Sequence, residues 1–117
     1  MTLDLLQAAD LDVQIHLPDG LVRVVRQNLI DLTPWHIMTR EQARTRLSGL
    51  RQRYKAKYVP FARRQDNDDL AVLLPEAPGR VIVIHDFAEE GWQFVAEFPS
   101  FWDWLRATVE EMIAFDE

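Results

Sequence analysis

The sequence predicts an α+β domain, with an antiparallel sheet of about four strands or more flanked by helices near the N- and C-terminal ends. Apolar residues at helical spacing lie before residue 31 and after residue 99. Short strand-like apolar runs lie between residues 59 and 96, separated by Pro, Gly, Asp and Asn. Connections this short favour antiparallel pairing. We expect the terminal helices to cover one face of the sheet.

The composition fits a single domain over residues 1–117, with 48% hydrophobic and 27% charged residues. The chain has no cysteine, which excludes disulfides, thiolate metal sites and cysteine nucleophiles. No apolar run approaches the ~20 residues of a transmembrane helix, and the first residues lack the basic and apolar pattern of an export signal. We therefore expect no membrane association and a cytoplasmic location.

The N-terminal third predicts three elements. Residues 1–9 suit either a short helix or a strand, and their pattern does not decide between them. Pro18-Asp19-Gly20 marks a turn or a helix start. Apolar positions 21, 25 and 29, with 22 and 30, predict a helix that Pro34 ends. Residues 35–38 predict a short strand.

Thr39-Arg40-Glu41-Gln42 is a capping-box pattern that predicts the start of a second helix, which runs to about Tyr54. Its apolar side comprises Ala43, Leu47 and Leu50. Strands are expected at residues 59–62, 70–74, 81–84 and 92–96. The third of these is β-branched throughout, which favours burial on both faces.

A final helix is expected from Pro99, in its first turn, to about Ile113. The hydroxyl of Ser100 is placed to cap its backbone. Helical spacing predicts an apolar side made of Phe101, Leu105, Thr108, Val109 and Met112. Aromatic residues gather in this part of the chain, and most are expected in the core. Exposure of either Trp102 or Trp104 would suit a protein interface.

The net charge of −6 is unevenly distributed. Residues 40–64 carry nine basic groups against Glu41 alone, whereas residues 65–117 carry two basic groups against thirteen acidic ones. Either the basic helix folds onto the acidic remainder, or the acidic part faces a basic partner. The negative balance argues against nucleic-acid binding.

Few residues suggest chemistry. The histidines lack metal-binding spacing, and no metal or cofactor is expected. His85-Asp86 ends a predicted strand and could act as a general base, although a histidine bonded to its neighbour is the simpler interpretation. Asp66-Asn67-Asp68-Asp69 fails the EF-hand pattern and predicts a turn, in which a carboxylate can pair with Arg63 or Arg64.

Four segments carry a family resemblance: Pro34-Trp35-His36-Ile37-Met38, Tyr58 to Ala71, Gly79 to Asp86, and Phe98-Pro99-Ser100-Phe101-Trp102-Asp103-Trp104-Leu105. In their order and spacing they resemble the SUKH superfamily, the Smi-one/Knr-four homology group. The resemblance covers about 80 of the 117 residues. It implies an α+β domain with no shared catalytic residues. Many bacterial members are thought to be immunity proteins that neutralise toxins, and others are regulatory interaction modules.

The expected function is therefore non-enzymatic binding of a protein partner, a toxin domain, by occlusion. The expected contacts are two acidic groups: Asp86, Glu89 and Glu90, and Asp66, Asp68 and Asp69. We expect a monomer or weak homodimer. Two alternatives stay open: a regulatory scaffold with a housekeeping partner, and a small enzyme that uses His85 and Asp86 in one pocket.

Overall fold

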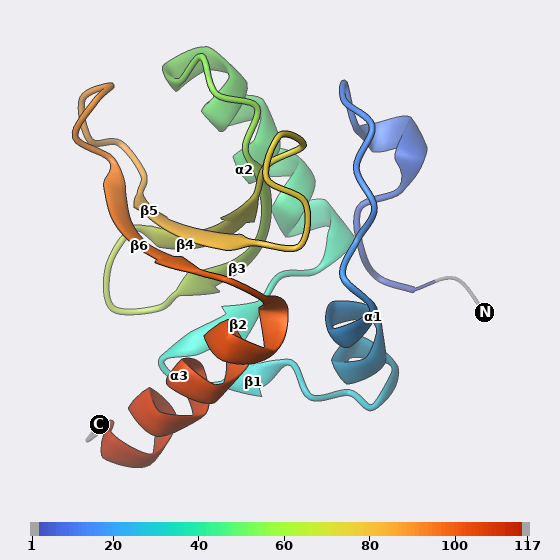
Figure 1. Ribbon diagram of the computed structural model, residues 1–117, viewed down its shortest axis with the longest axis vertical. Coiled ribbons are helices and arrows are strands. Elements are labelled where there is room, and N and C mark those ends of the chain that lie inside the picture. The colour runs from blue at the N-terminus through green and yellow to red at the C-terminus, as the bar shows by residue number, and fades with distance from the viewer. Residues whose placement is uncertain (1–2, 116–117) are drawn as a thin grey trace.

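The computed structural model describes residues 3–115, so the first two residues of the ambiguous segment 1–9 lie outside it. It has the expected α+β architecture, with six antiparallel strands ordered in the sheet as they are along the chain (Figure 1). The strands are β1 (Asp31–Leu32), β2 (Trp35–Ile37), β3 (Val59–Arg64), β4 (Asp69–Leu73), β5 (Val81–His85) and β6 (Phe94–Phe98). The helices are α1 (Asp19–Arg26), α2 (Arg40–Arg53) and α3 (Phe101–Ala114).

The helices lie on both sides of the sheet, and the terminal helices α1 and α3 share one side, as predicted (Figure 1). α2 lies on one side, and α3 lies on the other with α1 beside its N-terminal end (Figure 1). The cause is the composition of the central strands. Leu70 and Val72 alternate with Ala71 and Leu73 along β4, and all four are at most 2% exposed. A strand with two apolar faces needs cover on both.

The capping box predicted for α2 is confirmed. The Thr39 hydroxyl accepts a hydrogen bond from the Gln42 backbone N–H at 3.2 Å, and the Gln42 side chain accepts one from the Thr39 N–H at 3.1 Å. Ala43, Leu47 and Leu50 form the buried side of this helix, as predicted. These contacts fix where α2 starts and which face it turns to the sheet.

The N-terminal helix is shorter than predicted. It ends in a Schellman motif, with Asn28 at φ 59° and hydrogen bonds from the Asn28 and Leu29 N–H groups to the carbonyls of Val25 and Val24. Pro34 does not end it but lies in the β1–β2 turn, after a cis Thr33–Pro34 peptide bond. In the segment before α1, residues 8–10 form only a short 3₁₀ turn.

α3 begins as predicted at the Ser100 cap, whose hydroxyl accepts from the Asp103 N–H at 3.2 Å. Pro99 precedes the cap and is not in the first turn. The buried side is Phe101, Trp104 and Thr108, whereas Met112 is 37% exposed. Trp104 packs edge-on against Trp35 and Phe61, with ring centroids 5.7 and 5.1 Å apart. Among residues 3–115, no helix is long and apolar enough to cross a membrane.

Candidate functional site

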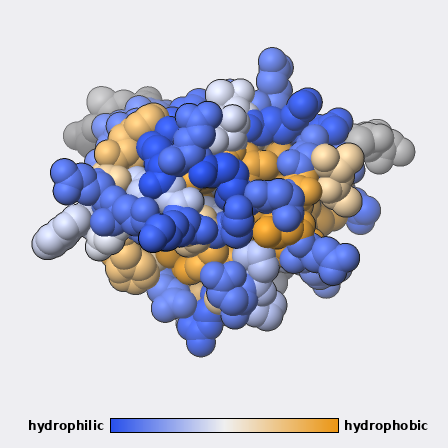
Figure 2. Space-filling view, turned by 90° about the horizontal axis from the view of Figure 1, so that it is seen from above, coloured by the Kyte–Doolittle hydropathy of each residue, from blue (hydrophilic) through white to orange (hydrophobic). Residues whose placement is uncertain are grey.

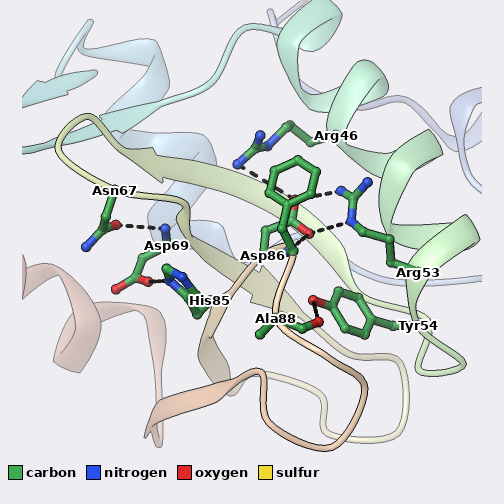
Figure 3. Close-up of polar contacts among 9 residues, drawn as sticks. Arg46, Arg53, Tyr54, Asn67, Asp69, His85, Asp86 and Ala88 are labelled. Atoms are coloured by element: carbon green, nitrogen blue, oxygen red, sulfur yellow. Dashed lines mark hydrogen bonds and ion pairs between the residues drawn. The ribbon is translucent and has the colours of Figure 1, made fainter.

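Asp86 follows β5 and is completely buried against α2 (Figure 3). Its carboxylate accepts two hydrogen bonds from the Arg53 guanidinium, at 2.8 and 2.7 Å, and lies 3.7 Å from Arg46. It also accepts a bond from the Phe87 N–H at 2.8 Å. The expectation that Asp86 is an exposed acidic contact for a partner is therefore wrong. A buried carboxylate must be paired, and a basic helix lies beside it.

His85 precedes Asp86 and faces the other side of the sheet. Its Nδ1 atom lies 2.8 Å from a carboxylate oxygen of Asp69, on the neighbouring strand (Figure 3). The His85 side chain is 49% exposed. Successive residues of a strand point to opposite faces, and Asp86 has no exposed surface. The two side chains therefore do not share the solvent-open pocket that the enzymatic alternative requires.

The connection between β5 and β6 is braced by α2 and by the segment that follows it. The Tyr54 hydroxyl donates to the Ala88 carbonyl at 2.7 Å (Figure 3). The Lys55 N–H donates to the Glu90 carboxylate at 3.2 Å. Burial raises the pKa of Tyr54, and the nearby Asp86 carboxylate adds to this. The connection is thus held in one conformation by groups outside it.

Phe87 occupies the left-handed region, at φ 71°. Its ring lies over the Arg53 guanidinium, 4.1 Å from the ring centroid, while 58% of the residue stays exposed. The Asp86 carboxylate accepts a hydrogen bond from the Phe87 N–H. This geometry is costly for a residue with a bulky side chain, so these contacts must compensate for it.

The segment 87–95 presents large apolar side chains to solvent. The exposed fractions are 58% for Phe87, 81% for Trp92, 62% for Phe94 and 48% for Val95. Glu89 and Glu90 are also exposed. We call these six residues the 87–95 surface. The sequence prediction named Glu89 and Glu90 as partner contacts but assigned most aromatic residues to the core and missed the apolar residues of this surface. The available signal was that the last strand of a meander lies at the edge of its sheet.

The second acidic group lies in the β3–β4 turn, close to the first. The backbone N–H of Asp86 donates to the carbonyl of Asp68 at 3.0 Å, so the two predicted groups meet at one end of the sheet. Asp68 is exposed. Asp69 binds His85, and Asp66 pairs with Arg64 at 2.6 Å, which lowers the pKa of Asp66. The predicted pairing of this turn with Arg64 is confirmed.

The charge of α2 is largely neutralised within the chain. Arg40 pairs with Asp10 at 2.8 Å and Arg51 with Asp12 at 2.7 Å. These hydrogen bonds lower the pKa values of Asp10 and Asp12 to about 2. The basic helix therefore does fold onto acidic segments. Glu89 and Glu90 form no ion pair among those observed in residues 3–115. Their carboxylates therefore remain available to a basic partner, so the second alternative stays open too.

Two of the open clefts formed by residues 3–115 have volumes of about 550 Å³ or more. One, of about 570 Å³, lies between the start of α2 and the β3–β4 turn and is lined by Arg46 and Arg63 but also by Glu41 and Asp68. The other, of about 550 Å³, is mainly apolar and lies between Leu3, the end of α1 and β2. Neither is lined by His85 or Asp86. Within residues 3–115, no three His, Asp or Glu side chains are grouped as metal ligands.

No protein-family model, curated protein or solved structure matches the chain. The assignment of the α+β fold therefore rests on the structure alone.

Proposed function

We propose that this chain is a non-enzymatic protein-binding module of the immunity type, which neutralises a protein toxin in the cytoplasm by covering its functional surface. The proposal adopts the function implied by the resemblance to the SUKH superfamily. Its partner is a basic protein, and no nucleic acid, membrane or cofactor is involved.

One observation supports this proposal above the others: Trp92 is 81% exposed at the end of a braced connection. Trp is enriched among the residues that dominate binding energy at interfaces. An exposed tryptophan on a rigid support loses little conformational freedom on binding. Phe94 and Val95 extend the apolar area beside it.

The charges around this apolar centre indicate the chemistry of the partner. Glu89 and Glu90 lie within three residues of Trp92 and are exposed. Viewed from the side of α2 and the β5–β6 connection, the molecule is mainly hydrophilic, with smaller hydrophobic areas between the polar side chains (Figure 2). An apolar centre within a polar rim is the usual anatomy of an interface. An acidic rim speeds encounter with a basic partner.

Capture of the partner from the native cell, followed by a growth assay, tests the proposal. The tagged chain is cross-linked in the cell, and the bound protein is identified. That protein is then expressed in a host with and without the chain. The proposal expects growth to be inhibited by the captured protein alone and restored when the chain is present.

Charge reversal identifies the surface in the same assay. The variant Glu89→Lys with Glu90→Lys should associate more slowly and restore growth less well, because it repels a basic partner. The matched control is Glu76→Lys with Glu110→Lys, which reverses two exposed carboxylates elsewhere. A captured protein that does not inhibit growth would contradict toxin neutralisation. Equal effects of the two double variants would remove this surface from the proposal.

A further inference from the structure

The two edges of the sheet differ in length. β1, at one edge, has only two residues, which is too short to template much pairing. β6, at the other edge, has five and pairs only with β5 among the described strands. Every second residue of an edge strand points its N–H and C=O groups outward, unpaired.

β6 has few of the features that prevent an edge strand from pairing. It contains no proline or lysine, and its one charged residue is Glu97. The register shifts between Val83 and Ile84, so Val95 has no partner residue on β5 and forms a bulge, which is one of the features that hinder edge pairing. Val95 is 48% exposed. Phe94 is 62% exposed at the start of the strand. Aromatic and β-branched side chains at such positions are suited to cross-strand pairing.

We propose that β6 binds an extended, Lys- or Arg-containing segment of the partner as a seventh strand of the sheet. This inference rests on the proposed function and specifies how its partner binds. The incoming backbone would pair with the outward groups of residues 94–98, and its apolar side chains would lie beside Phe94 and Val95.

Charge selects a basic segment over a second copy of the chain. Glu89 and Glu90 precede the strand, and Glu97 lies within it; all three are exposed. Arg80, 3.3 Å from Glu97, is the only basic group seen to pair with any of them among the described residues. A two-fold pairing of β6 with itself would offer Glu97 no basic side chain, because residues 94–98 contain none. Basic side chains at alternate positions of a partner strand would meet the acidic groups favourably.

The test uses the full chain and a ten-residue peptide with alternating lysine and valine. The control peptide has the same sequence but carries N-methyl groups on alternate backbone amides, which removes strand hydrogen bonds and keeps the charge. Losing two such bonds should weaken binding by about tenfold or more. At about ten times the dissociation constant, the first peptide should slow hydrogen exchange of outward amides in residues 94–98 by about tenfold. The variant Glu97→Lys should bind it less well than Glu110→Lys does.

The outcomes separate this inference from the function on which it rests. Protection confined to residues 94–98, lost with the methylated peptide, supports strand addition. Equal binding of both peptides, or protection elsewhere, overturns it. A chain that sediments as a dimer with β6 already protected overturns it in favour of a second copy. A captured toxin that is neutralised without protection of β6 also overturns it, yet leaves the proposed function standing. Protection of β6 in a chain that neutralises nothing supports strand addition and refutes the function.

Discussion

The guanidinium of Arg53 and the carboxylate of Asp86 form a two-point ion pair, with N···O distances of 2.8 and 2.7 Å across 33 residues of sequence. Asp86 is fully buried, and the side chain of Arg53 is 26% exposed. The pair joins the last turn of α2 to the residue that follows β5. It thereby fixes the start of the connection that carries the 87–95 surface.

We predict that Asp86→Asn lowers the free energy of unfolding by about 3 kcal/mol, because it leaves the Arg53 charge beside an apolar core without its partner. Urea unfolding measures the loss. The double variant Asp86→Asn with Arg53→Met should lose less than the two single variants added together. Additive losses would show that the pair contributes no coupling energy.

Asp10 gives the chain a specific acid sensitivity. Its hydrogen bond with Arg40 lowers its pKa from 3.8 to about 2. A lowered pKa in the folded state stabilises the fold above pH 4, and this contribution disappears as the pH falls toward 2. Asp10→Asn should therefore be less stable than the native chain at pH 5 and converge with it near pH 2. Urea midpoints measured between these values test this. The control, Asp68→Asn, replaces an exposed carboxylate that is not paired with Arg40.

Trp92→Ala should separate binding from stability. With 81% of this residue exposed, the free energy of unfolding should change by no more than about 0.5 kcal/mol. Binding of the captured partner should weaken by about 2 kcal/mol or more. Calorimetry on the purified complex and urea unfolding give the two values. Ile113→Ala is the control, since Ile113 is 71% exposed on α3. If both substitutions weaken binding alike, Trp92 is not the centre of the interface.

The two tryptophans of α3 should differ sharply. Trp104 is 1% exposed, so Trp104→Ala should cost about 3–5 kcal/mol, whereas Trp102 is 40% exposed and its replacement should cost far less. Within residues 3–115, the Trp104 indole N–H has no hydrogen-bond partner. Trp104→Phe should therefore lose much less stability than Trp104→Ala, because it removes an unsatisfied buried donor while keeping an aromatic ring. Thermal unfolding of the three variants checks this order.

The sequence predicted the elements whose signals are local. The box at Thr39 and Gln42 forms as expected, and Ser100 caps α3. In both caps the two bonded residues are three positions apart, so the sequence pattern that predicts the cap already contains both partners of the hydrogen bond. The end of α1 was missed because Asn28 in a left-handed conformation stops the helix well before Pro34.

Long-range contacts explain the remaining errors. Asp86 resembled an exposed loop residue because its partner, Arg53, lies on another element. The placement of α2 on the side opposite to α1 and α3 (Figure 1) was not predicted, although the two apolar faces of β4 and β5 were visible in the sequence. The apolar residues of the 87–95 surface were missed because aromatic residues are usually buried, and composition does not identify edge strands.

The order of the six strands has a kinetic consequence. Each strand pairs with the next strand of the chain, and the longest excursion between partners is the one that contains α2. Pairing strands that are neighbours in the sequence costs little loop-closure entropy. We therefore expect the chain to refold within roughly milliseconds to a second. Under the proposed function, fast folding would let the chain bind its partner soon after synthesis.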